Sequence, residues 1–253
     1  MYVKQGEKKH FFFFLFLGTP RCPLNKDQSS HRIVLNYKGI PYRTEWVEVP
    51  DIEPLSKKLG ISPTGLKKDG SPYYTVPAIY DPATGTAIAD SFVITEYLEN
   101  TYPETPSVFP KDSAALQKAF EPNLVQNICS AWPFIIPVVA LKLNPRSEEY
   151  LRLREISYGE RVVIPTGDVG TEEWGKFKKG MDIAHSYLVM TDKRGPYMMG
   201  DTISWSDIVL FGFLSFFKVI WGEDSPEWKD IASWNGGRWE AHIDALKKYN
   251  TVL

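Results

Sequence analysis

The sequence predicts a chain of two parts, an α/β N-terminal part followed by an all-helical C-terminal part. Strand-like and helix-like segments alternate up to about residue 100, and a proline-rich linker follows at residues 104–112. From Ser113 onward the apolar residues follow helical periodicity, with almost no strand signal. The 253 residues are enough for two domains, and we expect these domains to span residues 1–103 and 113–253.

The N-terminal part is expected to run strand, helix, strand, helix, strand, strand, helix. Its first strand is the run FFFFLFL at residues 11–17, because uniform apolarity is typical of a strand buried on both faces. The helix that follows contains IVLNYK and ends at Gly39. The remaining segments are, in order, YRTEWVEV, DIEPLSKKLG, a hairpin of TVPAIYD and TGTAIAD, and SFVITEYLENTY, for which Ser91 is the expected N-cap.

The C-terminal part is expected to begin with a long helical stretch over residues 113–143. Pro122, Pro133 and Pro137 must bend or interrupt this stretch, because proline removes a helical hydrogen bond. The next helix is SEEYLRLREISYGERVV, with Ser147 as its expected N-cap. Two further long helices and two short terminal segments complete the prediction.

The segment ISWSDI predicts a well-capped helix start. Ser204 lies three residues before Asp207, so each side chain can accept a hydrogen bond from the backbone near the other residue. Ile203 and Ile208 flank this capping box as a hydrophobic staple. We expect a core helix to begin at this point.

The composition argues against several classes of partner. The 29 basic and 31 acidic residues leave a formal charge of −2, without the concentrated positive surface that nucleic acid requires. Two cysteines are too few for a disulfide framework, and no N-glycosylation sequon is present. No apolar run is long enough to span a bilayer, and FFFFLFL is short for a signal peptide. We therefore expect a cytoplasmic protein with no nucleic-acid or membrane partner.

The segment TVPAI is the first candidate binding feature. Pro77 stands just before a strand of apolar residues, where it would remove a ladder donor. A cis Val76–Pro77 bond would resolve this conflict and free the Val76 N–H and C=O to pair with an extended peptide. The alternative is an ordinary proline at a sheet edge.

Asp90 and Ser91 form the second candidate feature. They occupy a strand-to-helix turn, where the helix N-terminus offers unpaired N–H groups that can bind a carboxylate. Asp90 can receive an ammonium group at the same place. The alternative is that both residues only cap the helix.

The VPAI segment, followed by Asp90-Ser91 and an all-helical part, resembles the glutathione transferases. This family joins a thioredoxin-like domain to a helical bundle, and the resemblance covers the chain from about His31 onward. GDTISWSDI is similar to the family's folding signature. The segments LNYKGIPYRTEWVEVPDIEP, LNPRSEEY and SPEWKDIASWNGGRW resemble the fungal-specific A class, which is related to bacterial β-etherases.

The resemblance implies a detoxification enzyme, a homodimer with glutathione as cosubstrate and no metal. Val76 and Pro77 would clamp the cysteinyl part of glutathione, and Asp90 and Ser91 would hold its γ-glutamyl end. The thiolate would attack small apolar aromatic electrophiles, by conjugation or ether cleavage. The residues expected to line the electrophile pocket are Trp132 and Phe134.

The residue that stabilises the thiolate should lie between the first strand and the first helix. In the fungal-specific A class this loop resembles WSPNTWKTR, in which the serine assists the thiol. This chain has RCPLNKDQSSHR at the equivalent place, so Asn25 stands at the serine position. An asparagine amide can donate to a thiolate. Cys22-Pro23 instead resembles the omega-type enzymes, in which a cysteine thiolate reduces mixed disulfides.

Three functions therefore stay open: a glutathione-conjugating or ether-cleaving enzyme, a thiol transferase using Cys22, and a non-catalytic glutathione-fold binding or regulatory protein. The departure from the class stops near His31. We hypothesise that residues 1 to about 25 include misassigned coding sequence, and transcript sequencing across the junction tests this.

Overall fold

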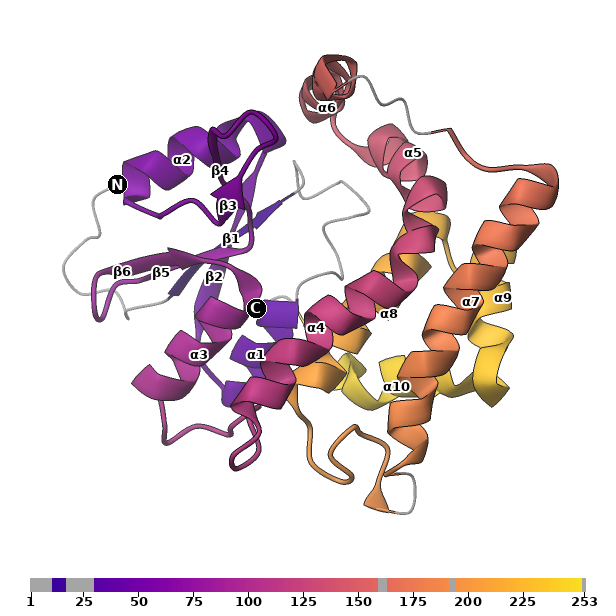
Figure 1. Cartoon of the computed structure of the whole chain (residues 1–253). Coiled ribbons are helices and arrows are strands. Elements are labelled where there is room, and N and C mark those ends of the chain that lie inside the picture. The colour runs from indigo at the N-terminus through magenta and orange to yellow at the C-terminus, as the bar shows by residue number, and fades with distance from the viewer. Residues whose placement is uncertain (1–10, 17–29, 159–162, 192–193, 252–253) are drawn as a thin grey trace.

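The computed structural model describes residues 11–16, 30–158, 163–191 and 194–251. It has an α/β part followed by a helical part (Figure 1), as the sequence predicts. The main sheet has the strand order β2-β1-β5-β6. These strands are β1 (Phe11–Phe16), β2 (Tyr42–Val47), β5 (Ala78–Asp81) and β6 (Thr86–Ala89).

The central position predicted for the first strand is confirmed. β1 pairs with β2 in parallel and with β5 antiparallel, and β5 pairs antiparallel with β6. A strand flanked on both sides can be uniformly apolar. A small ribbon of β3 (Gly65–Leu66) and β4 (Pro72–Tyr73) adds to the predicted order.

Helices cover both faces of the sheet. Alternate residues of β5 point to opposite faces, so Ile79 joins the core formed with α1 (Ser30–Lys38) and α3 (Ser91–Thr101), while Ala78 joins a second core. This second core includes Val47, Val49 and Ile52, at the start of α2 (Ile52–Leu59). A short 3-10 turn, η2 (Val49–Asp51), precedes α2, and Gly60 ends α2 with a left-handed φ of 72°.

The helical part packs around α8, which is buried along most of its length. Its elements are α4 (Ala114–Ile128), η3 (Cys129–Ala131), α5 (Trp132–Lys142), α6 (Pro145–Tyr158), α7 (Gly167–Val189), α8 (Trp205–Trp221), α9 (Pro226–Ser233), η5 (Trp234–Gly237), α10 (Arg238–Leu246) and η6 (Lys247–Tyr249). The C-terminal end returns to the α/β part, where Asn36 Nδ2 donates to the carbonyls of Tyr249 (2.6 Å) and Thr251 (2.9 Å).

The predicted long helix over residues 113–143 is interrupted once, at η3. Pro133 lies in the first turn of α5, where the missing N–H would have no helical partner in any case. Pro122 and Pro137 lie inside α4 and α5.

The sequence-based N-cap at Ser147 is wrong. The helix already begins at Pro145, and the Asn144 carbonyl accepts a bond from the Glu148 amide at 2.9 Å. Proline is favoured at the first helical position because its φ suits the helix. Ser147 is buried and contacts the α/β part instead.

The capping box at the start of α8 is confirmed. Ser204 is the N-cap, and both reciprocal bonds between Ser204 and Asp207 are present. Ile203 and Ile208 are buried, as expected for the staple. Asp207 also accepts from the Met198 amide at 2.7 Å, so the box fixes the preceding loop as well.

Residues Ala114–Lys142 form a 29-residue helical stretch that is long and apolar enough to cross a membrane, by length and composition alone. In its most apolar window 22% of the residues are buried. One such helix is weak evidence, because core helices of soluble proteins meet the same test, and here α4 and α5 contact α8. The expectation that the chain has no membrane partner stays a prediction.

Candidate functional site

The strand register brings the two predicted binding motifs together. Ala78 pairs with Ala89 at the end of the β5–β6 ladder. Because the ladder is antiparallel, the residues just before Ala78, which include Val76, and those just after Ala89, which include Asp90 and Ser91, leave the sheet at the same end. The Val76–Pro77 peptide bond is cis, as the sequence analysis expects. The Val76 backbone and the start of α3 therefore lie at the same end of the sheet, where β5 begins and β6 ends.

Asp90 is the N-cap of α3. Its Oδ1 accepts hydrogen bonds from the amides of Phe92 (3.0 Å) and Val93 (3.1 Å). Its φ of 84° lies in the left-handed region, which aspartate tolerates better than most residues. The N-cap assigned to Ser91 from the sequence is therefore off by one residue, and Ser91 is the first helical residue.

β1 finishes at the same end of the sheet. Phe14 pairs with Ala78, and β1 runs antiparallel to β5, so its last residues continue toward Val76. Residues 17–29 follow this point in the chain. The predicted catalytic residues Cys22 and Asn25 lie in that segment, outside the described residues, so their role stays a prediction.

Glu121 of α4 lies close enough to Asp90 for the two carboxylates to interact electrostatically, and the sequence alone did not identify it. Glu121 is partly buried, and burial together with the Asp90 carboxylate raises the pKa of Glu121. One turn earlier on the same face of α4, Lys118 Nζ lies 5.2 Å from the centre of the Phe92 ring. Two interacting carboxylates give this end of the site the charge that an ammonium group requires.

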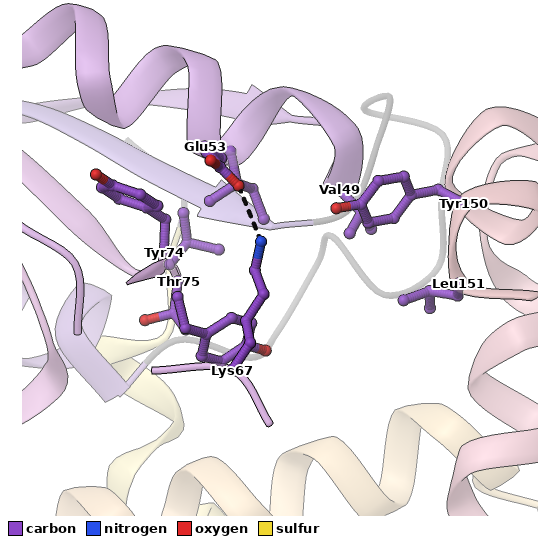
Figure 2. Close-up of a pocket in the computed structure, with 10 residues that line it drawn as sticks. Val49, Glu53, Lys67, Tyr74, Thr75, Tyr150 and Leu151 are labelled. Carbon is purple, nitrogen blue, oxygen red and sulfur yellow. Dashed lines mark hydrogen bonds and ion pairs between the residues drawn. The ribbon is translucent and has the colours of Figure 1, made fainter. Parts of the chain in front are cut away.

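A cavity of about 220 Å³, shown in Figure 2, is lined in part by Val76. It is lined by residues from both parts of the chain: Val49, Ile52, Glu53, Lys67, Tyr73, Tyr74, Thr75, Val76, Tyr150 and Leu151. Figure 2 shows Tyr74 and Thr75 on one side, Tyr150 and Leu151 on the other, and the Glu53–Lys67 pair between them.

Lys67 brings a positively charged group to the cavity. Glu53 binds two lysines, with Lys57 Nζ at 2.8 Å from Oε1 and Lys67 Nζ at 3.2 Å from Oε2. The hydrogen bonds from Lys57 and Lys67 hold the pKa of Glu53 below its usual value, and the bond from Lys57 has the larger effect. One carboxylate for two ammonium groups leaves Lys67 able to bind an added carboxylate. The sequence alone did not identify Lys67, because its position depends on the β3–β4 ribbon.

Trp132 and Phe134 pack within the helical part. The Trp132 ring lies 6.3 Å from that of Phe213 and 6.5 Å from that of Phe216, both on α8. Phe134 meets Trp174 of α7 edge-on at 5.2 Å. Neither residue lines the cavity beside Val76, and their role in an electrophile pocket stays a prediction.

The described residues contain no group of three or more His, Cys, Asp or Glu side chains placed to hold a metal ion. Among the described residues, the site combines carboxylates at Asp90 and Glu121, the backbone of Val76 and an ammonium group at Lys67, a set that suits recognition of a small zwitterionic peptide.

Family comparisons agree with this geometry. Residues 31–101 match the glutathione S-transferase N-terminal domain, and residues 115–249 match the glutathione S-transferase C-terminal domain. The glutathione S-transferase-like protein ustS of Aspergillus flavus is 31% identical over 97% of this chain and 94% of its own length. A glutathione S-transferase of Ceriporiopsis subvermispora, solved in complex with glutathione, has a TM-score of 0.87 at 37% identity, over 96% of this chain and 99% of that chain.

The chain belongs to the glutathione S-transferase family, with its thioredoxin-like N-terminal domain and helical C-terminal domain. Within that family its structural neighbours include fungal FuA-class enzymes. The glutathione transferase GSTFuA3 of Phanerochaete chrysosporium has a TM-score of 0.86 at 33% identity, over 97% of this chain and 99% of that chain. The resemblance drawn from the sequence is confirmed.

Proposed function

We propose that the protein is a glutathione transferase whose bound glutathione thiolate attacks small apolar aromatic electrophiles, by conjugation or ether cleavage. The observation that carries this proposal is the antiparallel β5–β6 ladder, which brings Val76, Asp90 and Ser91 to the same end of the sheet. One extended tripeptide can reach all three residues.

The charges of the site give the tripeptide a direction. Its γ-glutamyl carboxylate lies at the N-terminus of α3, where the helix dipole favours an anion. The ammonium group lies at Asp90 and Glu121, and the cysteinyl backbone pairs with Val76. The glycyl carboxylate points to Lys67, at the floor of the 220 Å³ cavity.

In this orientation the sulfur faces the end of β1, after which residues 17–29 follow in the chain. A hydrogen-bond donor there favours the thiolate and lowers the pKa of the glutathione thiol. Asn25 supplies an amide donor, and Cys22 is the alternative group. The thiolate then attacks an electron-poor carbon, a C–S bond forms, and the leaving group departs with the bonding electron pair.

The test is turnover of 1-chloro-2,4-dinitrobenzene with glutathione by the wild-type protein, Cys22→Ser and Asn25→Ala. We expect conjugation by the wild-type protein and by Cys22→Ser, and a slower rate for Asn25→Ala. Loss of all activity in Cys22→Ser, together with reduction of a glutathione mixed disulfide by the wild type, supports the thiol transferase instead. Glutathione binding without turnover on several electrophiles supports a non-catalytic protein.

The cytoplasmic location, the homodimeric state and a role in detoxification are part of this proposal. They rest on the family resemblance and on the composition. Light scattering after size-exclusion chromatography tests the dimer, and cell fractionation tests the location.

A further inference from the structure

The cavity beside Val76 is larger than a glycyl residue requires. A volume of about 220 Å³ is well above the roughly 10–15 Å³ that a single water needs. Its walls are mainly aromatic and aliphatic: Val49 and Ile52 are buried, and Tyr73, Tyr74 and Tyr150 also line it. A glycyl group offers such walls nothing to contact.

The wall contributed by the helical part is fixed in place. Glu48 accepts hydrogen bonds from Asn144 Nδ2 at 2.5 Å and from the Ser147 hydroxyl, while the Val49 amide donates to Ser147 Oγ at 3.1 Å. Ser147 is 1% exposed, so these bonds form where water does not compete for them. They tie the first turn of α6 to η2.

A bidentate ion pair adds to this attachment. Arg146 Nη2 lies 2.7 Å from Asp51 Oδ1, and Arg146 Nη1 binds the other oxygen of the same carboxylate. Tyr150 and Leu151 follow Ser147 by three and four residues, so they lie on its face of α6, and Figure 2 shows both beside the cavity. Leu151 contacts both hydrophobic cores. The cavity is therefore preformed between two elements that are held together.

We propose that Tyr150 and Leu151 of α6 form a selectivity wall for the third residue of the thiol peptide, and that this subsite accepts γ-glutamylcysteinyl peptides with an apolar or aromatic third residue. This inference rests on the proposed function, because Val76 must hold the cysteinyl backbone for the third residue to enter the cavity. The terminal carboxylate stays at Lys67, and the side chain packs against Tyr74, Tyr150 and Leu151.

The experiment compares glutathione with γ-glutamylcysteinylphenylalanine by titration calorimetry on the full-length protein. We expect the dissociation constant of the phenylalanine peptide to be no more than about threefold that of glutathione. Leu151→Trp fills the space beside Tyr150, so it should weaken the phenylalanine peptide about tenfold or more relative to its effect on glutathione. Leu141→Trp, at a position 82% exposed on α5, is the matched control and should change neither affinity.

Wild-type protein that binds glutathione but binds the phenylalanine peptide more than about tenfold more weakly contradicts the subsite and leaves the proposed function intact. An equal loss of both peptides in folded Leu151→Trp also contradicts it. Wild-type protein that binds neither peptide contradicts the proposed function itself. The comparison of the two peptides on the wild-type protein needs no substitution, so its result does not depend on whether Leu151→Trp folds.

Discussion

Ala78 and Ala89 form the last pair of the β5–β6 ladder, and the two binding motifs extend from this pair. Because the ladder is antiparallel, the residues before Ala78 and those after Ala89 leave the sheet on the same side. Val76-Pro77 and Asp90-Ser91 thus become neighbours although they are 14 positions apart in the sequence. Both candidate binding motifs therefore lie at one end of the sheet.

Asp90→Ala should weaken glutathione binding about tenfold or more, because it removes the carboxylate that receives the ammonium group. It should also lower the free energy of unfolding by about 0.5–2 kcal/mol, because the amides of Phe92 and Val93 lose their cap. Asp90→Asn separates the two effects, since asparagine caps the helix and tolerates the positive φ but carries no charge. Calorimetric affinity and urea denaturation measure the two quantities. Unchanged affinity in both variants removes Asp90 from the site.

Lys67→Met should weaken glutathione binding about tenfold, because the glycyl carboxylate loses a charged donor. Lys57→Met is the matched control: Lys57 shares the Glu53 carboxylate but does not line the cavity. We expect it to change affinity by less than about threefold. Equal effects of the two substitutions would indicate a general loss of positive charge and argue against a carboxylate subsite at Lys67.

Stability should fall as the pH drops below about 6.5, the usual pKa of histidine in an unfolded chain. His242 is buried, and burial lowers its pKa, an effect that Arg238 adds to and Asp207 opposes. Below that pH the unfolded chain therefore binds a proton that the folded chain does not. The expected loss approaches about 1.4 kcal/mol per pH unit.

His242→Gln should remove this pH dependence and keep a donor for the Asp207 carbonyl, which lies 3.0 Å from His242 Nε2. Urea denaturation between about pH 5 and pH 7.5 measures the slope in both proteins. An identical slope in the variant assigns the effect to other groups.

Gly180→Ala should destabilise the helical part by about 2 kcal/mol or more. A Cβ at this position would lie 1.9 Å from the Asn127 carbonyl oxygen, where α7 crosses the end of α4. Gly175 lies on the same helix, and a Cβ added there would have no neighbour within 4 Å, so Gly175→Ala should instead stabilise by up to about 1 kcal/mol. Thermal unfolding of the two variants, which carry the same chemical change, gives a direct comparison. Equal midpoints would contradict the close approach.

The sequence was sufficient for features encoded in short segments. The capping box of Ser204 and Asp207, the strand FFFFLF and the VPAI segment each depend on near neighbours in the chain. The cap of α3 was misplaced by one residue because Asp90 and Ser91 are both good N-cap residues. Ser147 was misread because Pro145 starts the helix earlier.

The features that the sequence did not reveal depend on contacts between distant segments. Glu48 and Ser147 are 99 positions apart, and Lys67 reaches the site only through the fold of β3 and β4. Glu121 approaches Asp90 because α4 packs beside the start of α3. Periodicity and capping rules describe single elements, and they do not determine which side chains of different elements meet.

A crystal structure of the protein with glutathione is the most direct test of the proposed glutathione site. We expect the γ-glutamyl group at Asp90 and Ser91, the cysteinyl backbone paired with Val76, and the terminal carboxylate within about 3.2 Å of Lys67 Nζ. We also expect a side chain from residues 17–29 within about 3.5 Å of the sulfur. Glutathione bound away from Val76, or bound with its two ends exchanged, would contradict the proposed site.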